Sequence, residues 1–206
     1  DRYNAMRLEQ IVDEIGWPTY SKVGKDGSHA AWNIIQHAVF NPPLMSKCLE
    51  LMKKELDKDE VDGIDYAYLY DRFHAVCYLG KQDYGIVRKV PIKDEYLVEQ
   101  RRKEIGFQTT LNEYLGAYTP KTKEECKRIE LELQEKYETN LEKGKELLKQ
   151  GNLEEAAKYY EKVMSCNGYI QIEDIYNSAR IKSMQNTRRS KFQAIRNIRS
   201  LSARGF

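Results

Sequence analysis

The sequence has no long apolar run and few cysteine and histidine residues. No stretch approaches the length that crosses a bilayer, so we expect no membrane span. The four cysteines among 206 residues are scattered, with no C-x-x-C pair and no neighbouring histidines at zinc-ligand spacing. Buried, reduced thiols favour a reducing compartment such as the cytoplasm. The first residue is Asp, however, which leaves a removed N-terminal signal open.

Sequence motifs of several enzyme classes are also missing. The chain contains no G-x-S-x-G nucleophile elbow, no P-loop and no Rossmann fingerprint. The stretch SKVGKDG offers lysines and backbone N–H groups to an anion, but it lacks the Walker spacing. The sequence therefore predicts no cofactor and leaves open whether the protein is an enzyme.

Charge is divided unevenly along the chain. From Ile175 onward there are eight basic residues and no acid, so the preceding part carries 26 basic and 32 acidic residues. This basic tail could dock on the acidic body, or contact nucleic acid or an anionic lipid surface. Nucleic acid is the less favoured partner, because only Phe192 and Phe206 supply rings for base stacking in the basic half of the tail.

Apolar residues recur at helical spacing through most of the chain, so the sequence predicts a mainly α-helical protein. A multi-helix domain is expected over residues 1–118, with at most a short extended segment or hairpin near 82–92, where β-branched residues, Gly85 and Pro91 interrupt the helical pattern. A helical extension is expected over residues 119–206, ending in a basic helix within the tail, 175–206.

The extension contains a stretch, residues 137–167, that resembles a single tetratricopeptide repeat. Gly144, Gly151, Ala156 and Tyr160 have the spacing of two helices joined by a tight turn. One such unit cannot bury a solenoid face alone, so we expect a helical hairpin packed on the body. A protein or peptide partner that binds through residues 119–170 is the alternative.

The stretch SHAAWNIIQHA, residues 28–38, predicts a helix with Ser28 as its N-cap and with an unusual polar face. At 100° per residue its apolar side chains gather on one side, which we expect to face the core. The opposite arc holds no Lys, Glu or Arg, which a solvated face would normally carry. It is formed instead by neutral hydrogen-bonding residues, an arrangement that indicates a lined polar pocket: His29, Asn33, Gln36 and His37.

A second polar cluster lies beside an aromatic stripe in the stretch YAYLYDRF. Asp71 and Arg72 point away from the stripe and could form an ion pair or bind an anion. Asp71 also precedes His74 by three residues, so its carboxylate could orient that imidazole. A metal site built from His29, His37, His74 and Asp71 is disfavoured, because the first two lie two turns apart on their helix.

Several of these stretches together resemble the uncharacterised family called domain of unknown function 6624. The chain has, in the order typical of that family, GWPTYSKVG, AAWNIIQHA, YAYLYDR, GKQDYG and VPIKDEYLVEQRRKEIGFQTTLNEYL, all within residues 4–116. It departs from the family pattern at HAVF, where the family has His-Ala-Asp, and at YGIV, where the family tends to have Y-G-T-Q. The resemblance implies no reaction, but it marks the matching polar residues: Ser21, Lys22, Gly24, Gln36, His37, Asp71, Arg72, Gln82 and Tyr84.

Two functions remain open at this point. The first is a binding or interaction protein with a polar pocket lined by His37 and Gln36, which takes a small polar or anionic ligand. The second is a hydrolase or transferase in which His37 is the general base and Arg72 binds an anionic group. In that case Gln82 or Tyr84 would orient the substrate. Candidate catalytic residues are His37, Asp71 and Arg72, and candidate binding residues are Ser21, Lys22, Gly24, Asn33, Gln36, Gln82 and Tyr84.

Overall fold

The computed structural model describes residues 2–77, 80–166, 170–184, 194 and 197. These residues form nine α-helices, one π-helical segment and one 3₁₀ segment, and no β-strand occurs among them. The prediction of a mainly α-helical, multi-helix protein is therefore confirmed.

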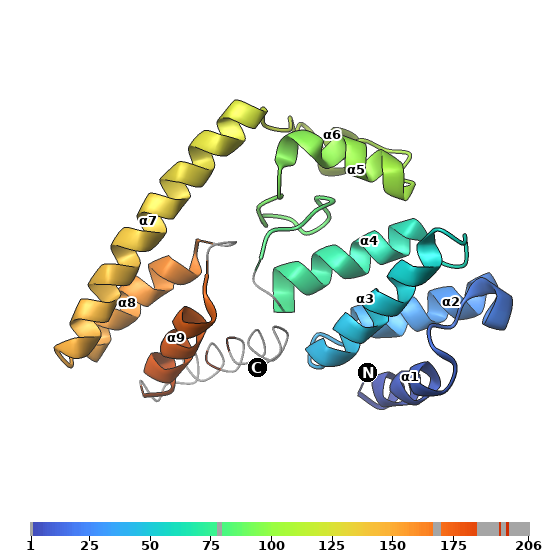
Figure 1. Cartoon of the computed structure of the whole chain (residues 1–206), viewed down its shortest axis with the longest axis horizontal. Helices are drawn as coiled ribbons and strands as arrows, with labels where there is room; N and C mark the ends of the chain where they lie inside the picture. Colours follow the sequence, from blue (N-terminus) through green and yellow to red (C-terminus); the bar gives the residue numbers. More distant parts are fainter. Residues whose placement is uncertain (1, 78–79, 167–169, 185–193, 195–196, 198–206) are drawn as a thin grey trace.

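Four helices form the N-terminal body: α1 (Arg2–Ile15), α2 (Tyr20–Gln36), α3 (Pro42–Leu56) and α4 (Gly63–Arg72). Helix α4 continues directly into the π-helical segment η1 (Phe73–Cys77). The expected core face of the second helix is buried, since Ala31, Ile35 and Ala38 are each at most 6% exposed. All four helices contribute to a single apolar core, in which α2 and α3 both pack against α4 (Figure 1).

Helix α2 begins nine residues earlier than the sequence predicts. The helix starts at Tyr20 after the N-cap Thr19, and Ser28 lies buried within it. The prediction of Ser28 as an N-cap is therefore wrong. The two helical pieces are joined at Gly24, whose φ of 74° produces a kink and suits a residue without a Cβ atom.

A long loop and three short segments follow the body. The loop runs from residue 80 to the 3₁₀ segment η2 (Glu95–Leu97), which leads into α5 (Val98–Ile105) and then α6 (Leu111–Leu115). The extended character expected near residues 82–92 amounts to a single parallel β-bridge between Gln82 and Ile92.

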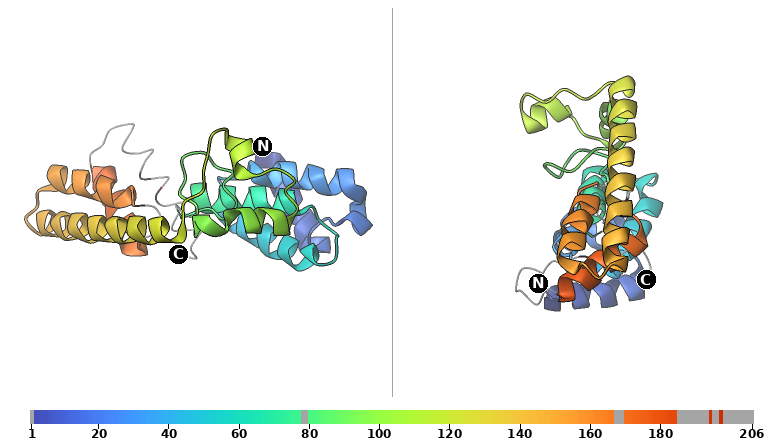
Figure 2. Two further views of the ribbon diagram at one scale, coloured as in Figure 1. Left: turned by 90° about the horizontal axis from the view of Figure 1, so that it is seen from above. Right: turned by 90° about the vertical axis from the view of Figure 1, so that its left-hand side faces the viewer.

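The remaining helices form an arm beside the body: α7 (Lys123–Lys149), α8 (Leu153–Met164) and α9 (Ile172–Met184). Figure 2 shows α7 and α8 side by side at one end of the elongated molecule, with α1 and α2 at the other. Gly144 allows the close approach of α7 and α8, because a Cβ atom there would lie 3.0 Å from the Tyr160 ring. The predicted basic tail extends beyond α9, and most of it lies outside the described residues.

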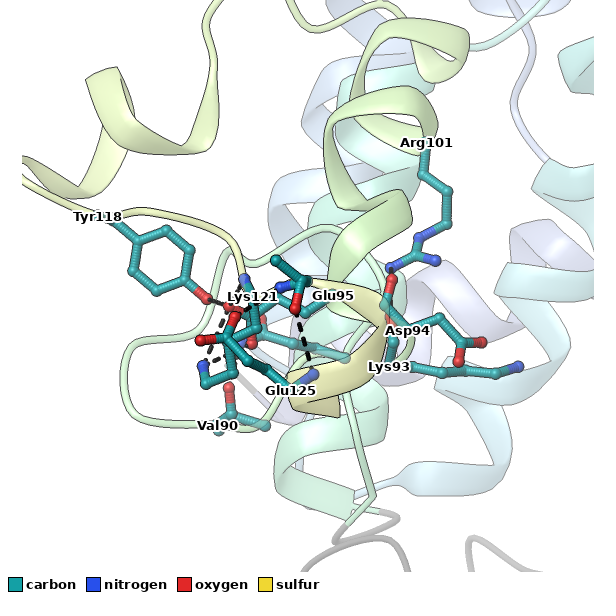
Figure 3. A network of polar contacts seen from close by, with 10 residues as sticks. Val90, Lys93, Asp94, Glu95, Arg101, Tyr118, Lys121 and Glu125 are labelled. Carbon is teal, nitrogen blue, oxygen red and sulfur yellow. Dashed lines mark hydrogen bonds and ion pairs between the residues drawn. The ribbon is translucent and has the colours of Figure 1, made fainter. Parts of the chain in front are cut away.

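A buried carboxylate connects the loop to the start of the arm. Glu95 is only 6% exposed, and it accepts hydrogen bonds from the Tyr118 hydroxyl and from the Lys121 backbone N–H, the latter at 3.0 Å (Figure 3). The Lys121 Nζ atom lies 2.8 Å from Glu95 Oε2. Farther along α7, Lys81 of the loop pairs with Glu130 at 2.6 Å.

Candidate functional site

A cavity of about 400 Å³ opens between α2, the α4–η1 helix, the loop and α6, and we call it the α2–α4 cavity. Its volume falls in the range of small-molecule binding sites. Nine residues line it: Trp32, Gln36, Tyr68, Arg72, Val76, Ile86, Val87, Arg88 and Tyr114.

Helical spacing explains how these side chains reach one place. Trp32 and Gln36 lie one turn apart on α2, and Tyr68 and Arg72 lie one turn apart on α4. The two rows meet where the Trp32 and Tyr68 rings make an edge-to-face contact, with centroids 6.2 Å apart. The cavity therefore follows the groove between two packed helices, and the loop and Tyr114 form its other side.

The cavity is cationic, because Arg72 and Arg88 line it and no carboxylate does. Within the described part of the chain, neither arginine forms an ion pair, and the Arg72 Nε atom is buried without a hydrogen-bond partner. The two arginines of α5 differ, since Arg101 Nε donates to Asp83 O at 2.8 Å and Arg102 Nη1 donates to Tyr84 O at 2.9 Å. Arg72 and Arg88 thus keep donors for another partner.

Asp71 holds the loop and does not pair with its neighbour Arg72. Its fully buried carboxylate accepts backbone N–H hydrogen bonds from Asp83 at 2.7 Å and from Tyr84 and Ile86 at 3.1 Å. Burial raises the pKa of Asp71 to about 6, although the three N–H groups act in the opposite direction. Asp71 therefore shapes the cavity through the loop without lining it.

Gln82 and Tyr84 also support the loop. The Gln82 amide group accepts from Val87 N at 2.7 Å and donates to the carbonyl oxygens of Val87 and Val90. The Tyr84 ring makes an edge-to-face contact with the Tyr70 ring. Burial raises the pKa of Tyr84. Gln82 therefore positions Val87 and Val90, and neither Gln82 nor Tyr84 lines the α2–α4 cavity.

The three histidines do not converge. His37 is exposed at the C-cap of α2, outside the cavity lining, whereas His29 Nδ1 lies 2.8 Å from Asp65 Oδ2. The His74 Nδ1 atom lies 2.9 Å from Tyr70 O, and burial lowers the pKa of His74. Among the described residues, no three His, Cys, Asp or Glu side chains lie close enough together to hold a metal ion. This includes the set considered from the sequence, which consists of the three histidines and Asp71.

The remaining predicted site residues lie at the start of α2 or on its surface. Ser21 N donates to Glu60 Oε2 at 2.8 Å, and Lys22 Nζ donates to the carbonyl oxygen of Ile15. Gly24 is exposed at the kink, and exposed Asn33 accepts a hydrogen bond from Gln36. Of all the predicted site residues, only Gln36 and Arg72 line the cavity.

The aromatic members of the lining and Arg88 were not predicted from the sequence as site residues. The signal for two of them was present, because Trp32 precedes Gln36, and Tyr68 precedes Arg72, by one helical turn. No sequence spacing brings Tyr114 of α6 to this groove, since that contact depends on the path of the loop.

A second cavity, of about 380 Å³, lies between the loop and α7, and we call it the α7 cavity. On the α7 side its lining consists of Cys126, Ile129, Glu130 and Leu133. Val87 and Arg88 line both cavities, so the same loop segment separates them.

Comparison with protein families gives a match over the N-terminal part of the chain. A model of a family of unknown function (DUF6624) matches residues 1–121, which is more than half of the chain. The chain belongs to this family. In this DUF6624 protein the match ends at Lys121, and Ile86 and Val87 of the stretch YGIV lie in the wall of the α2–α4 cavity.

Other comparisons with this DUF6624 protein find no match among curated proteins or solved structures. The family match stops before α8, so the tetratricopeptide resemblance stays a prediction, as does a peptide partner for residues 119–170. Within the described residues, no helix has the length and apolar character needed to cross a membrane.

Proposed function

We propose that this chain is a ligand-binding protein whose α2–α4 cavity takes a small anionic ligand. The observation that carries the proposal is Arg72, which is partly buried in an acid-free cavity with no hydrogen bond or ion pair in the described structure. A buried N–H donor without a partner, such as the Arg72 Nε group, is costly. An oxyanion would satisfy its guanidinium in two parallel hydrogen bonds.

Two further features of the lining support an anion. Arg88 adds a second positive charge from the loop, and it forms no ion pair in the part of the chain described. Burial raises the pKa of Tyr68 to about 12, with a smaller effect from the neighbouring Tyr114 side chain. The phenol therefore stays protonated at neutral pH and can donate a hydrogen bond.

Binding is favoured over catalysis by the composition of the lining. It contains no His, Cys, Ser, Asp or Glu side chain that could serve as a general base or nucleophile. His37, the general base of the alternative function, lies outside the lining, at the end of α2. The hydrolase or transferase hypothesis therefore lacks a base beside Arg72.

The test is the binding of simple anions to the full chain. Inorganic phosphate, sulfate and citrate should raise the melting temperature, and calorimetry should give weaker binding for Arg72→Gln by about 10- to 100-fold, since hydrogen bonds to charged groups contribute about 1.5–3 kcal/mol each. Arg128→Gln, which removes an exposed arginine of α7, is the matched control and should bind like the wild type.

The outcomes separate the two functions. Loss of binding in Arg72→Gln but not in Arg128→Gln or His37→Ala supports the cavity as the site. Anion binding that disappears in His37→Ala would instead favour the alternative centred on that histidine. No stabilisation of the wild type by any of the three anions would overturn the proposal.

A further inference from the structure

The two arginines account for only part of the α2–α4 cavity. Of the nine lining residues, six are aromatic or aliphatic, and the aliphatic ones are Val76, Ile86 and Val87. On the same scale a cavity that just holds one water measures about 10–15 Å³, so a bare phosphate or sulfate ion would leave much of about 400 Å³ to water. A ligand that fills the cavity therefore has an apolar body as well as its anionic group.

The aromatic rings of the lining are held in fixed orientations. The Trp32 ring stacks on His29 with centroids 4.9 Å apart, and it meets Tyr68 at an interplanar angle of 89°. The Tyr68 ring also packs against Phe107, 6.4 Å away. Because neighbours fix these rings before any ligand enters, contact with a flat ligand ring costs little conformational entropy.

A third aromatic ring, that of Tyr114, lines the same cavity as Trp32 and Tyr68. Tyr114 belongs to α6 and is 38% exposed, although it lines the cavity. Because three separate helices contribute rings to the lining, a ligand whose apolar part is an aromatic ring is favoured. Ring–ring contacts add about 0.5–1.5 kcal/mol beyond the contribution of buried apolar surface.

The charge of the lining indicates the anionic group. Arg72 and Arg88 contribute two positive charges from different elements, with no acid among the lining residues. A phosphate monoester carries a charge of about −1.5 to −2 at neutral pH and presents three acceptor oxygens, whereas a carboxylate carries one charge. A phosphate monoester therefore balances both arginines.

We infer that the ligand class of the α2–α4 cavity is phosphate monoesters that carry an aromatic ring, mononucleotides included. The inference rests on the proposed function, because it specifies the ligand of the same site. It places the phosphate at Arg72 and Arg88 and the ring against Trp32, Tyr68 and Tyr114.

The experiment is calorimetric titration of the full chain with five compounds. Phenyl phosphate and adenosine 5′-monophosphate should bind at least 10-fold more tightly than glycerol 3-phosphate, which has the same anionic group and no ring. Adenosine, which has the ring and no charge, should show no measurable binding. Benzoate should bind more weakly than phenyl phosphate, because it balances only one arginine.

Variants of Tyr114 test the role of the rings. Tyr114→Leu should reduce the preference for phenyl phosphate over glycerol 3-phosphate to below 3-fold, while Tyr114→Phe should retain it. Tyr96→Leu is the matched control, because Tyr96 is also 38% exposed and lies outside the cavity lining. The phenylalanine variant shows whether an altered preference comes from the lost ring or from altered folding.

The results distinguish this inference from the proposed function. Equal binding of phenyl phosphate and glycerol 3-phosphate would overturn the aromatic requirement and leave an anion site in place. Benzoate binding as tight as phenyl phosphate would overturn the phosphate requirement alone. If none of these anions and none of the simple anions binds, both the inference and the proposed function fail.

Discussion

Asp71 is the residue on which the shape of the cavity wall most depends. Its carboxylate meets three backbone N–H groups of the loop, and both oxygens are used. In Asp71→Asn one oxygen becomes an NH₂ group that faces an N–H donor, so at least one buried hydrogen bond is replaced by repulsion. We expect the free energy of unfolding to fall by about 2–4 kcal/mol, measured by urea denaturation at pH 7.

The same residue gives stability a pH dependence of known sign. The pKa of Asp71 is about 6 in the folded protein, against an ordinary value of 3.8, so between these pH values the folded state binds a proton that the unfolded state does not. The free energy of unfolding therefore falls as pH rises from about 4 to 6, by up to about 3 kcal/mol from this group.

Asp71→Asn removes this titration, so the gap in stability between wild type and variant should narrow from pH 4.5 to 7. Protonated Asp71 keeps a lone pair on each oxygen, which the amide nitrogen introduced by the substitution lacks, so the variant does not imitate the acid form. A gap that is constant or widens over this pH range would contradict the assignment.

The sequence could predict single residues only where local spacing determined their position. Gln36 and Arg72 were selected from a helical arc and a short polar cluster, and both line one cavity, although their role as ligand-binding residues stays a prediction. Asp71 was expected to pair with Arg72 or orient His74, because those partners are near in sequence. Its actual partners lie 12 to 15 residues farther along, on a loop whose path no local pattern specifies.

The close packing of α4 against α5 depends on Gly63, the first residue of α4. A Cβ atom on Gly63 would lie 2.3 Å from the backbone carbonyl oxygen of Ile105, at the end of α5. Because backbone cannot move aside as a flexible side chain can, Gly63→Ala should separate α4 from α5 and lower the free energy of unfolding by about 2–4 kcal/mol.

Gly27→Ala in α2 is the matched control for this prediction. A Cβ atom there would lie 2.9 Å from the Cβ atom of Val23, a partly exposed residue of the same helix, so any shift stays within the first turns of α2 and involves no second element. Alanine also favours the helix by about 0.5–1 kcal/mol, which offsets part of this cost, so this variant should lose less stability than Gly63→Ala in the same urea denaturation experiment. Similar losses in both variants would contradict the specific contact between α4 and α5.

The existence of the helices was more predictable than their ends. Apolar periodicity correctly indicated a helix over residues 28–38, but it could not show that the chain before Gly24 is helical too, because WPTYSKVG has the composition of a loop. Likewise, YAYLYDRF predicts a continuous helix, whereas the turn widens to π-helical geometry at Phe73. Both differences arise from tertiary packing, which overrides local propensity.

At the scale of the whole molecule, the arm is joined to the body through a few polar contacts. Glu95 binds Tyr118 and Lys121, Lys81 pairs with Glu130, and the Thr122–Glu125 capping box starts α7. The sequence placed a boundary at residue 118 from the change in composition, and the family match ends at residue 121. The sequence could not show that the buried Glu95 depends on Lys121, which lies beyond that boundary.

The division at residue 118 can be tested with two fragments that differ by five residues. Fragment 1–122 keeps both partners of Glu95 and should unfold cooperatively, whereas fragment 1–117 leaves this buried carboxylate without Tyr118 and Lys121. Because Lys121 is partly exposed and solvent screens its charge, we expect fragment 1–117 to be less stable by about 1–3 kcal/mol in thermal and urea denaturation. Glu95→Gln should recover part of this loss in fragment 1–117, since a neutral amide is less costly to bury unpaired. If fragment 1–122 itself fails to unfold cooperatively, α7 to α9 belong to the core of the body and the chain is a single domain.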